Sequence, residues 1–451
     1  MQDFVHLHVH TQYSLLDGQA SVARLVDKAM KNGMKGIAVT DHGNMFGIKE
    51  FTNYVNKKNS GPKGEVKDLK KRIAGIEAGT IECEDKEAEI ADCKAKIVEA
   101  ESKLFKPIIG CEMYVARRTM DLREGKLDQS GYHLIVLAKN EKGYHNLIKL
   151  VSHAWTRGYY MRPRTDRSEL EKYHEGLIVC SACLGGEIPK RITNDQFAEE
   201  AIQWYKNLFG DDFYLEMQRH KATVPRANHE CYPMQVKVNK YLMEYAQKYN
   251  IKLICTNDVH FVDEENAEAH DRLICLSTGK DLDDPTRMLY TKQEWMKTRE
   301  EMNELFADVP EALSNTLEIL DKVEYYSIDH APIMPTFAIP EDFGTEEGYR
   351  QKYTEKDLFD EFTQDENGNV VDFNGNVIGK AGPAYQRLAY DKDGNIIGYI
   401  DENGNVVDFD GNVIGKMLED GTIVDENGNV IGRAGTVNRK LAYDKDGNVI
   451  G

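Results

Sequence analysis

The chain of 451 residues is long enough for roughly two or three domains, or for one large α/β barrel with additions. Its formal net charge of −19 excludes a globally basic surface, so any contact with nucleic acid has to be local. Eight cysteines without a regular spacing indicate a reduced, cytoplasmic protein. The first residues lack the pattern of a signal peptide, and no stretch is apolar enough for a membrane span, so we expect no membrane association.

The first line of the sequence, FVHLHVHTQYSLLDG, contains three histidines at alternate positions of an apolar segment that we expect to be a strand. Side chains two residues apart on a strand point the same way, so His8 and His10 can reach one point in space. Imidazole nitrogens placed in this way suit zinc, iron or manganese ions. We interpret His6, the first of the three, as a residue of the core or a support for the ligands.

Apolar strands next to metal-binding side chains recur along the chain as far as residue 260. A helix is predicted over residues 19–33 by its apolar spacing and its terminal glycine. The segments that follow are MKGIAVTDHGN with His42, KPIIGCEMYVA with Glu112, YHLIVLAKN with His133, GLIVCSACLGGEI with Cys183, and IKLICTNDVHF with Asp258 and His260. Alternating strands and helices indicate a parallel barrel or sheet, in which reactive groups gather where strands end.

Nine side chains of metal-binding type therefore form one candidate site. They are His8, His10, Asp17, His42, Glu112, His133, Cys183, Asp258 and His260. One zinc or manganese ion uses about three to six ligands, so the set predicts two or three divalent ions, which can be zinc, manganese or iron. Neighbouring ions of this kind serve phosphoester hydrolysis, and a carboxylate such as Glu112 can bridge two of them. The histidines at positions 145, 153, 174, 229 and 330 fit structural or surface roles instead.

A loop before a predicted helix, GYYMRPRTDRSELEKY, combines arginines with Tyr159 and Tyr160. Arginine suits forked phosphate recognition, and tyrosine rings stack on bases. We therefore predict that Arg162 and Arg164 bind substrate phosphate, with a solvated loop as the alternative. His220 follows the apolar stretch of FYLEMQRH and is predicted to contact substrate or to support the ligands.

Two further segments differ from the strand-and-helix pattern. Residues 60–105 show apolar positions three and four apart on both sides of a break at Ala78-Gly79-Thr80, which predicts an inserted helical hairpin, with either a structural role or a partner-binding role. Residues 364–451 repeat motifs such as DENGNVVDFDGNVIGK, which predicts an array of β-hairpins or β-arches. Asp391 and Asp393 resemble a calcium loop, but the glycine comes at position four instead of six, which favours a turn.

Eight motifs in order resemble the N-terminal region of the alpha subunits of bacterial DNA polymerase III. They are HLHVHTQYSLLDG, GIAVTDHGNMFG, KPIIGCEMYV, GYHLIVLAKN, YYMRPRTD, IVCSACLGGEIP, FYLEMQRH and TNDVHFV. The resemblance implies a polymerase-and-histidinol-phosphatase (PHP) domain over residues 1–270, with an α/β fold, a distorted (β/α)7 barrel. Residues 271–363 resemble the partly helical stretch that leads into the polymerase palm.

The resemblance also implies roles for the candidate residues. By this similarity His8, His10, Glu112 and Asp258 would hold one ion and form the catalytic centre, Glu112, His133 and Cys183 would hold a second, and Asp17, His42 and His260 a third. Because all nine positions are filled, the resemblance implies an active metal-dependent 3′–5′ exonuclease or phosphodiesterase. Its expected partners are DNA 3′ ends and other replisome subunits.

Two other functions are compatible with the same residues. The PHP region can be an inert scaffold that binds replisome partners, or the chain can be a stand-alone phosphatase of the histidinol-phosphatase type. The segment 271–363 argues against the second of these, because it resembles part of a polymerase. Metal content and nucleotide release from 3′ ends separate an enzyme from a scaffold.

The similarity stops near DLFDEFTQDENGNVV, and the PDxDxD-type motif that carries palm aspartates is not found in this sequence. We therefore expect that the purified chain alone cannot extend a DNA primer, because nucleotidyl transfer needs those carboxylates to hold its metal ions. Primer extension followed by gel electrophoresis tests this. Metal-dependent incorporation of nucleotides by the pure chain would contradict it.

Overall fold

The computed structural model describes residues 1–335 and, beyond them, 344, 347–348, 351, 363–364, 369–371, 376–381, 386–408, 411–439 and 442–443. The chain divides into two compact units, Met1–Ala331 and Pro332–Gly451. Within the described residues no helix combines the length and the apolar character that a membrane span requires.

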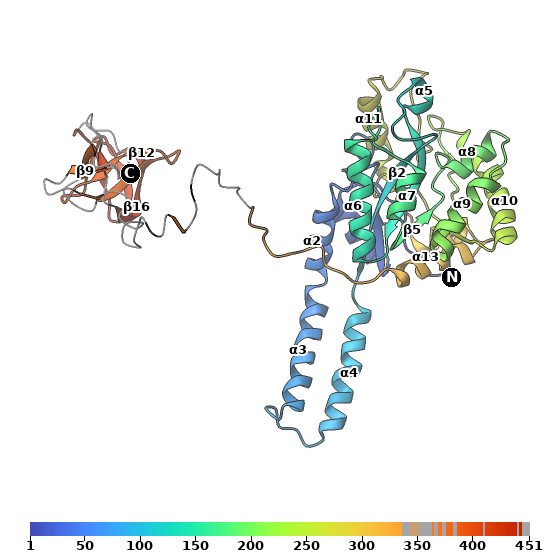
Figure 1. Cartoon of the computed structure of the whole chain (residues 1–451), viewed down its shortest axis with the longest axis horizontal. Helices are drawn as coiled ribbons and strands as arrows, with labels where there is room; N and C mark the ends of the chain where they lie inside the picture. Colours follow the sequence, from blue (N-terminus) through green and yellow to red (C-terminus); the bar gives the residue numbers. More distant parts are fainter. Residues whose placement is uncertain are drawn as a thin grey trace. The chain divides into compact units, whose positions relative to one another are not determined.

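A mixed sheet of seven strands forms the centre of the first unit (Figure 1). Its strands are β1 (Gly36–Val39), β2 (Lys106–Ala116), β3 (Gly131–Ala138), β4 (Arg164–Thr165), β5 (Leu177–Cys180), β6 (Phe213–Met217) and β7 (Lys252–Cys255). The order is β1-β2-β3-β5-β6-β7, and β4 pairs with β2. The α/β class predicted from the sequence is confirmed, since helices separate most of these strands along the chain.

Strand β3 departs from the parallel arrangement expected from the sequence. It runs antiparallel to both β2 and β5, whereas β1–β2, β5–β6 and β6–β7 are parallel pairs. The connection from β2 to β3 contains only the four-residue helix α5 (Gly125–Asp128), so the chain returns beside β2 without the crossover helix that usually joins parallel strands. The beginning of β3 therefore lies at the same edge of the sheet as the ends of its neighbours.

The N-terminal segment, residues 5–10, lies between β1 and the stretch that follows β7. The amide of Thr40 donates to the carbonyl of Val9, and the amide of Val259 donates to the carbonyl of His8. The expected strand is reduced here to a parallel bridge between Val9 and Val259. The reason is local, because the Thr40 hydroxyl takes the amide of Val9 at 2.8 Å where a strand would offer a backbone carbonyl.

Helices surround this sheet and bury their apolar faces in one continuous core. They are α1 (Val22–Lys31), α2 (Ile48–Lys58), α6 (Glu141–Thr156), α7 (Arg167–Tyr173), α8 (Glu187–Thr193), α9 (Glu199–Phe209), α10 (Cys231–Tyr249), α12 (Arg299–Leu305) and α13 (Glu311–Lys322), with single turns at Gly210–Asp212 and Glu264–Asn266. A further helix, α11 (Ala267–Thr278), packs Ala267 in a separate small cluster with Phe261 and Trp295. The predicted division at residue 270 does not coincide with a break in this core. Leu313 and Leu320 of α13 are buried in it, and Leu320 lies against Gly36 of β1.

The predicted insertion is an antiparallel pair of helices, α3 (Ser60–Glu77) and α4 (Lys86–Ser102), which extends away from the sheet in Figure 1. Ile76, Cys93 and Ala100 are buried between them, as the apolar spacing predicts. At the base of the pair, the side-chain amide of Asn59 donates to the carbonyl of Phe105 at 2.7 Å and accepts its N–H at 2.9 Å.

The β-strands among the described residues of the second unit form two sheets. The first contains β8 (Thr363–Gln364), β9 (Asn369–Val371), β10 (Val377–Ala381) and β17 (Ala442–Tyr443), and the second contains β11 (Gln386–Asp391), β12 (Ile396–Ile400), β13 (Asn405–Val407), β14 (Val413–Met417), β15 (Thr422–Val424) and β16 (Val430–Arg439). The strands β11–β16 close into a barrel, which the repeat pattern did not predict. Ala389, Ile400, Val406 and Ile423 form its core.

Asx-type turns connect the strands of this barrel. The carboxylate of Asp391 accepts the backbone N–H of Asn395 at 2.8 Å and its side-chain NH2 at 3.0 Å. Between them, Gly394 has φ +89°, a conformation that glycine adopts without strain. The same bonds recur from Asp401 to Asn405. These contacts engage the carboxylate in the turn itself, in agreement with the turn interpretation of the motif.

We expect Asn59→Ala to lower the free energy of unfolding by about 1–3 kcal/mol, because it leaves a buried N–H and C=O of Phe105 without partners. Asn53→Ala is the matched control, since Asn53 is exposed on α2 and its loss should change stability by no more than about 0.5 kcal/mol. Urea unfolding followed by circular dichroism measures both. Equal stability of the two variants would contradict the role of Asn59.

Candidate metal site

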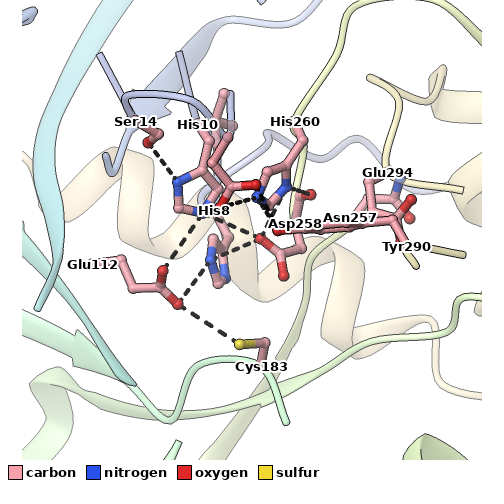
Figure 2. A network of polar contacts seen from close by, with 12 residues as sticks. His8, His10, Ser14, Glu112, Cys183, Asn257, Asp258, His260, Tyr290 and Glu294 are labelled. Atoms are coloured by element: carbon pink, nitrogen blue, oxygen red, sulfur yellow. Dashed lines mark hydrogen bonds and ion pairs between the residues drawn. The ribbon is translucent and has the colours of Figure 1, made fainter. Parts of the chain in front are cut away.

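All nine predicted ligand residues meet at one edge of the central sheet. Figure 2 shows His8, His10, Glu112, Cys183, Asp258 and His260 among them. They come from the N-terminal segment and its following loop, from the stretch after β1, from β2 and β3, and from the stretches after β5 and β7. His133 stands near the start of β3, and the reversed direction of that strand places it beside Glu112 of β2. His42 and Glu112 are joined by a parallel bridge beyond the end of β1.

The carboxylate of Glu112 lies at the centre of the cluster. Its Oε1 is 2.8 Å from His133 Nδ1 and 3.4 Å from His8 Nε2. Its Oε2 is 2.5 Å from His42 Nδ1 and 3.7 Å from His10 Nε2. Since its two oxygens face different histidines, this carboxylate has the geometry of a bridge between neighbouring cation positions.

Asp258 and Asp17 supply the other carboxylates. Asp258 Oδ1 lies 3.0 Å from His8 Nε2 and 3.2 Å from His10 Nε2. Asp17 Oδ2 lies 2.9 Å from His42 Nε2 and 3.8 Å from His260 Nε2. Each carboxylate therefore joins two imidazoles.

Three groups of ligand atoms are close enough to hold an ion each. They are His8 with His10 and Asp258, Glu112 with His133 and Cys183, and His10 with His42 and His260. The second is the set that the resemblance implies, and the first contains three of the four residues implied, without Glu112. In the third, His10 takes the place expected for Asp17, although Asp17 contacts both His42 and His260.

Unsatisfied polar atoms indicate that cations fit this cluster. Among the described residues, five of its buried nitrogen and oxygen atoms make no hydrogen bond. They are His8 Nε2, His10 Nε2, His42 Nδ1, Glu112 Oε2 and Asp258 Oδ1. Buried polar atoms without partners are costly in a folded protein, and these five are all of the type that coordinates zinc, manganese or iron. The donor set therefore fits divalent metal ions.

The charges of the cluster are strongly coupled. Burial opposes the charged form of Glu112, but the nearby His133 and His42 outweigh it and hold the pKa of Glu112 well below its usual value. Burial likewise opposes protonation of His8, yet Asp258 and Glu216 raise the pKa of His8 well above its usual value. Glu112 thus stays ionised, and metal binding has to displace a proton from His8, so metal affinity should rise with pH.

Residues behind the ligands orient the imidazoles. Glu216 of β6 accepts from His8 Nδ1 at 2.7 Å, which directs Nε2 of the same ring towards the cluster. Ser14 contacts His10 Nδ1 at 2.9 Å and donates to Asp41 at 2.7 Å. A carboxylate bonded to the far nitrogen of a histidine ligand fixes its tautomer and raises its basicity.

Three of the ligands lie in or directly after strained backbone. Asp258 itself has φ +45°, Ala182 before Cys183 has φ +61°, and Leu16 before Asp17 has φ +60°. Residues other than glycine seldom adopt this left-handed conformation, and it is typical of functional sites. The side-chain amide of Asn257 holds the first of these positions by donating to the carbonyls of Gln293 and Trp295.

The three residues predicted to contact substrate differ in exposure and in their contacts. Arg162 is exposed, and its guanidinium lies over the ring of Tyr114. Arg164 is fully buried and donates to the carbonyls of Gly158 and Met120, so the prediction that it binds substrate phosphate is wrong. Its register in β4, paired with Tyr114, turns the side chain inwards. His220 is buried, and its two ring nitrogens contact the carbonyl of Asn257 and the side chain of Gln235.

A cavity of about 230 Å³ adjoins the cluster and is lined by ligands, by His220 and by residues 288–291. From this last stretch, Tyr290 donates to Asp17 Oδ1 at 2.8 Å and lies 3.3 Å from His260 Nε2.

Sequence analysis missed Tyr290, because no motif in the surrounding sequence indicates a role in a metal site. It also missed Glu216, although an acid inside the apolar stretch FYLEM was a usable signal. Figure 2 shows Tyr290 beside His260.

We expect Glu216→Gln to weaken metal binding by about 10- to 100-fold, because the amide cannot hold the imidazole of His8 as the carboxylate does. Titration calorimetry with Zn²⁺ and Mn²⁺ measures this. Glu169→Gln is the matched control, since Glu169 is also a buried carboxylate bonded to a histidine, His153, but stands outside the cluster. Unchanged affinity in Glu216→Gln would show that the contact with His8 does not support metal binding.

Comparison with known proteins identifies the first unit. The PHP domain model matches residues 6–220. DNA polymerase III subunit alpha of Borreliella burgdorferi is 40% identical over 356 residues, covering 78% of this chain and 26% of that protein. The Treponema pallidum subunit is 35% identical over 364 residues, covering 80% and 26%. The chain thus spans about a quarter of the length of these relatives. It belongs to the family of bacterial DNA polymerase III alpha subunits, within which it corresponds to the PHP-domain region.

Proposed function

We propose that the chain is a metal-dependent phosphodiesterase that removes nucleotides from the 3′ ends of DNA. The observation that carries this proposal is the position of Glu112, whose two oxygens are shared between separate groups of imidazoles beside a cavity. Closely spaced cation positions joined by a carboxylate suit in-line displacement at phosphorus. The names of the relatives support DNA as the substrate, and replication, with other replisome subunits, as the setting.

The exposure of the ligands indicates the side from which a phosphodiester enters. His8, His10 and Glu112 have side chains no more than 1% exposed, whereas His42, His133 and Asp17 are 18–24% exposed. The first three therefore form the floor of the site, and His42 and His133 line the cavity above it. A phosphodiester entering the cavity would meet His42 and His133 first.

Divalent ions bound to these residues would supply Lewis-acid activation of water and neutralise charge on the phosphate. The protein's own residues set the geometry. Glu216 and Ser14 fix the rings of His8 and His10, and Asn257 holds the backbone before Asp258. His220 has both ring nitrogens engaged, so it shapes the cavity wall and is not suited to proton transfer.

The charge of the site makes its activity depend on cations. Asp17, Glu112, Asp258 and Glu216 bring four carboxylates together, and the whole chain carries a net charge of −19. A phosphodiester is also an anion, so bound cations are needed to neutralise its charge beside these carboxylates. The proposed activity should therefore be lost completely after treatment with a chelator.

We expect the chain, purified anaerobically and loaded with Zn²⁺, Mn²⁺ or Fe²⁺, to shorten 5′-labelled single-stranded DNA from its 3′ end. His8→Ala and Glu112→Gln should each lower the rate by more than about 100-fold, because even residues behind metal ligands contribute 10- to 100-fold. His145→Ala is the control, since His145 lies exposed on α6. Gel electrophoresis resolves the products.

Two outcomes would contradict the proposal. Less than one ion per chain together with no release of nucleotides would favour an inert scaffold that binds replisome partners. Faster hydrolysis of p-nitrophenyl phosphate than of DNA would favour a phosphatase of small molecules. Elemental analysis of the same preparation accompanies the assay, so that a missing ion and an inactive site are distinguished.

A further inference from the structure

Three aromatic side chains are exposed near the candidate metal site. Phe46, Trp155 and Tyr159 have 55%, 41% and 48% of their surface exposed. The rings of Trp155 and Tyr159 are stacked, with centroids 5.6 Å apart and planes inclined by 19°. Phe46 continues the row, with its centroid 6.0 Å from that of Trp155. We call these three residues the aromatic row.

The aromatic row is tied directly to the ligands. The indole N–H of Trp155 donates to the carbonyl of Gly43 at 2.8 Å, and Gly43 follows the ligand His42. The amide of Gly43 in turn donates to the carbonyl of Glu112 at 2.8 Å. Gly43 thus connects the aromatic row to the two ligands His42 and Glu112. The turn is also tightly packed, because a Cβ on Gly43 would lie 2.7 Å from Pro163.

The row is not explained by packing of the core. Helix α6 carries Trp155 near its end and buries a different face, with Leu147, Leu150 and Ala154 in the core. An exposed cluster of large aromatic rings beside a site marks a binding surface more often than a stable solvent-facing surface. Stacked, planar rings are also the usual platform for nucleobases, because every base offers a π face.

We propose that the aromatic row binds single-stranded DNA by stacking on bases close to the 3′ end, while the phosphodiester of the terminal nucleotide lies in the cavity. This inference rests on the proposed function and adds the element that holds the strand. Base stacking suits an acidic protein, since it does not require a basic surface. It also gives no sequence preference, because stacking does not read hydrogen-bonding groups.

Arg162 supplies one local positive charge to the same surface. It is exposed, and its guanidinium lies 5.9 Å from the ring centre of Tyr114. The ring of Tyr114 stacks on that of His42 at 6.3 Å. A phosphate between the row and the cavity could therefore meet Arg162, whose planar guanidinium suits phosphate oxygens.

The test measures binding without catalysis. Fluorescence anisotropy of a 5′-labelled oligothymidylate is recorded with the full chain in Ca²⁺, and in a chelator as reference. Each stacked base should contribute about 5- to 150-fold to affinity. We expect Trp155→Ala and Tyr159→Ala each to weaken binding by at least about 5-fold, and Trp155→Phe, which keeps a ring, to restore most of it. Phe197→Ala is the control and should bind as the native chain does, since Phe197 is an exposed ring (86%) outside the aromatic row, in the segment before α9.

A second oligonucleotide without bases in its last four positions distinguishes stacking from contacts with the backbone. The native chain should bind this abasic strand more weakly than the intact one, and Trp155→Ala should bind both strands about equally. Circular dichroism verifies that each variant is folded. If the variants lose affinity for both strands by the same factor, or if folded variants bind as the native chain does, the row does not stack bases. A native chain that binds neither strand would equally overturn the inference.

This outcome is separable from that of the proposed function. If the chain is inactive but its affinity for DNA still depends on bases and on Trp155, the binding surface is supported and the hydrolysis is contradicted. If the chain is active but the variants of the aromatic row bind DNA as the native chain does, the hydrolysis is supported and the binding surface is contradicted.

Discussion

The buried carboxylate of Glu112 is the constraint around which the first unit is organised. An ionised carboxylate away from water is unfavourable unless opposite charges or hydrogen bonds compensate it. Here compensation comes from His133, His42 and His8, which lie 2.5–3.4 Å from its oxygens and come from three separate parts of the chain. Each of these segments must therefore end at the same edge of the sheet, so the need to compensate one charge determines where several strands begin and end.

The reversal of β3 is the clearest consequence. In a purely parallel arrangement the start of a strand lies at the opposite edge from the ends of its neighbours, and His133 would be far from Glu112. Because β3 is antiparallel to β2 and β5, its first residues face Glu112 and the stretch that carries Cys183. The N-terminal segment makes a similar contribution, since its bonds to Thr40 and Val259 place His8 and His10 between the two outer strands.

Much of the site could be predicted because short stretches of the sequence are enough to indicate most of its ligands. The alternation of His8 and His10 requires only strand-like geometry, and the ligands next to apolar runs require only that strand ends meet. Exposure depends on distant packing, which explains the error at Arg164. Its sequence context is almost the same as that of Arg162, yet pairing of β4 with β2 buries one side chain, while the other stays exposed.

Other features could not be read from the sequence for the same reason. Tyr290 reaches Asp17 across more than 270 positions, and no short motif encodes such a contact. The closure of β11–β16 into a barrel depends on how strand β16 pairs with both β15 and β11. Repeated turn motifs specify the turns, as the bonds from Asp391 to Asn395 show, but they do not specify which edges join.

In the proposed function, the charge of the chain requires that the metal site and the surface around it hold different parts of the DNA strand. Most nucleases hold DNA with a basic surface, whereas the net charge here is −19. Cations bound at the candidate site would act over about a Debye length, roughly 8–10 Å at physiological salt, so in the proposed function they would attract the terminal phosphates and little else of the strand. The remainder of the strand needs a contact that is indifferent to charge. In the proposal above, the exposed rings of Phe46, Trp155 and Tyr159 provide such a contact beside His42.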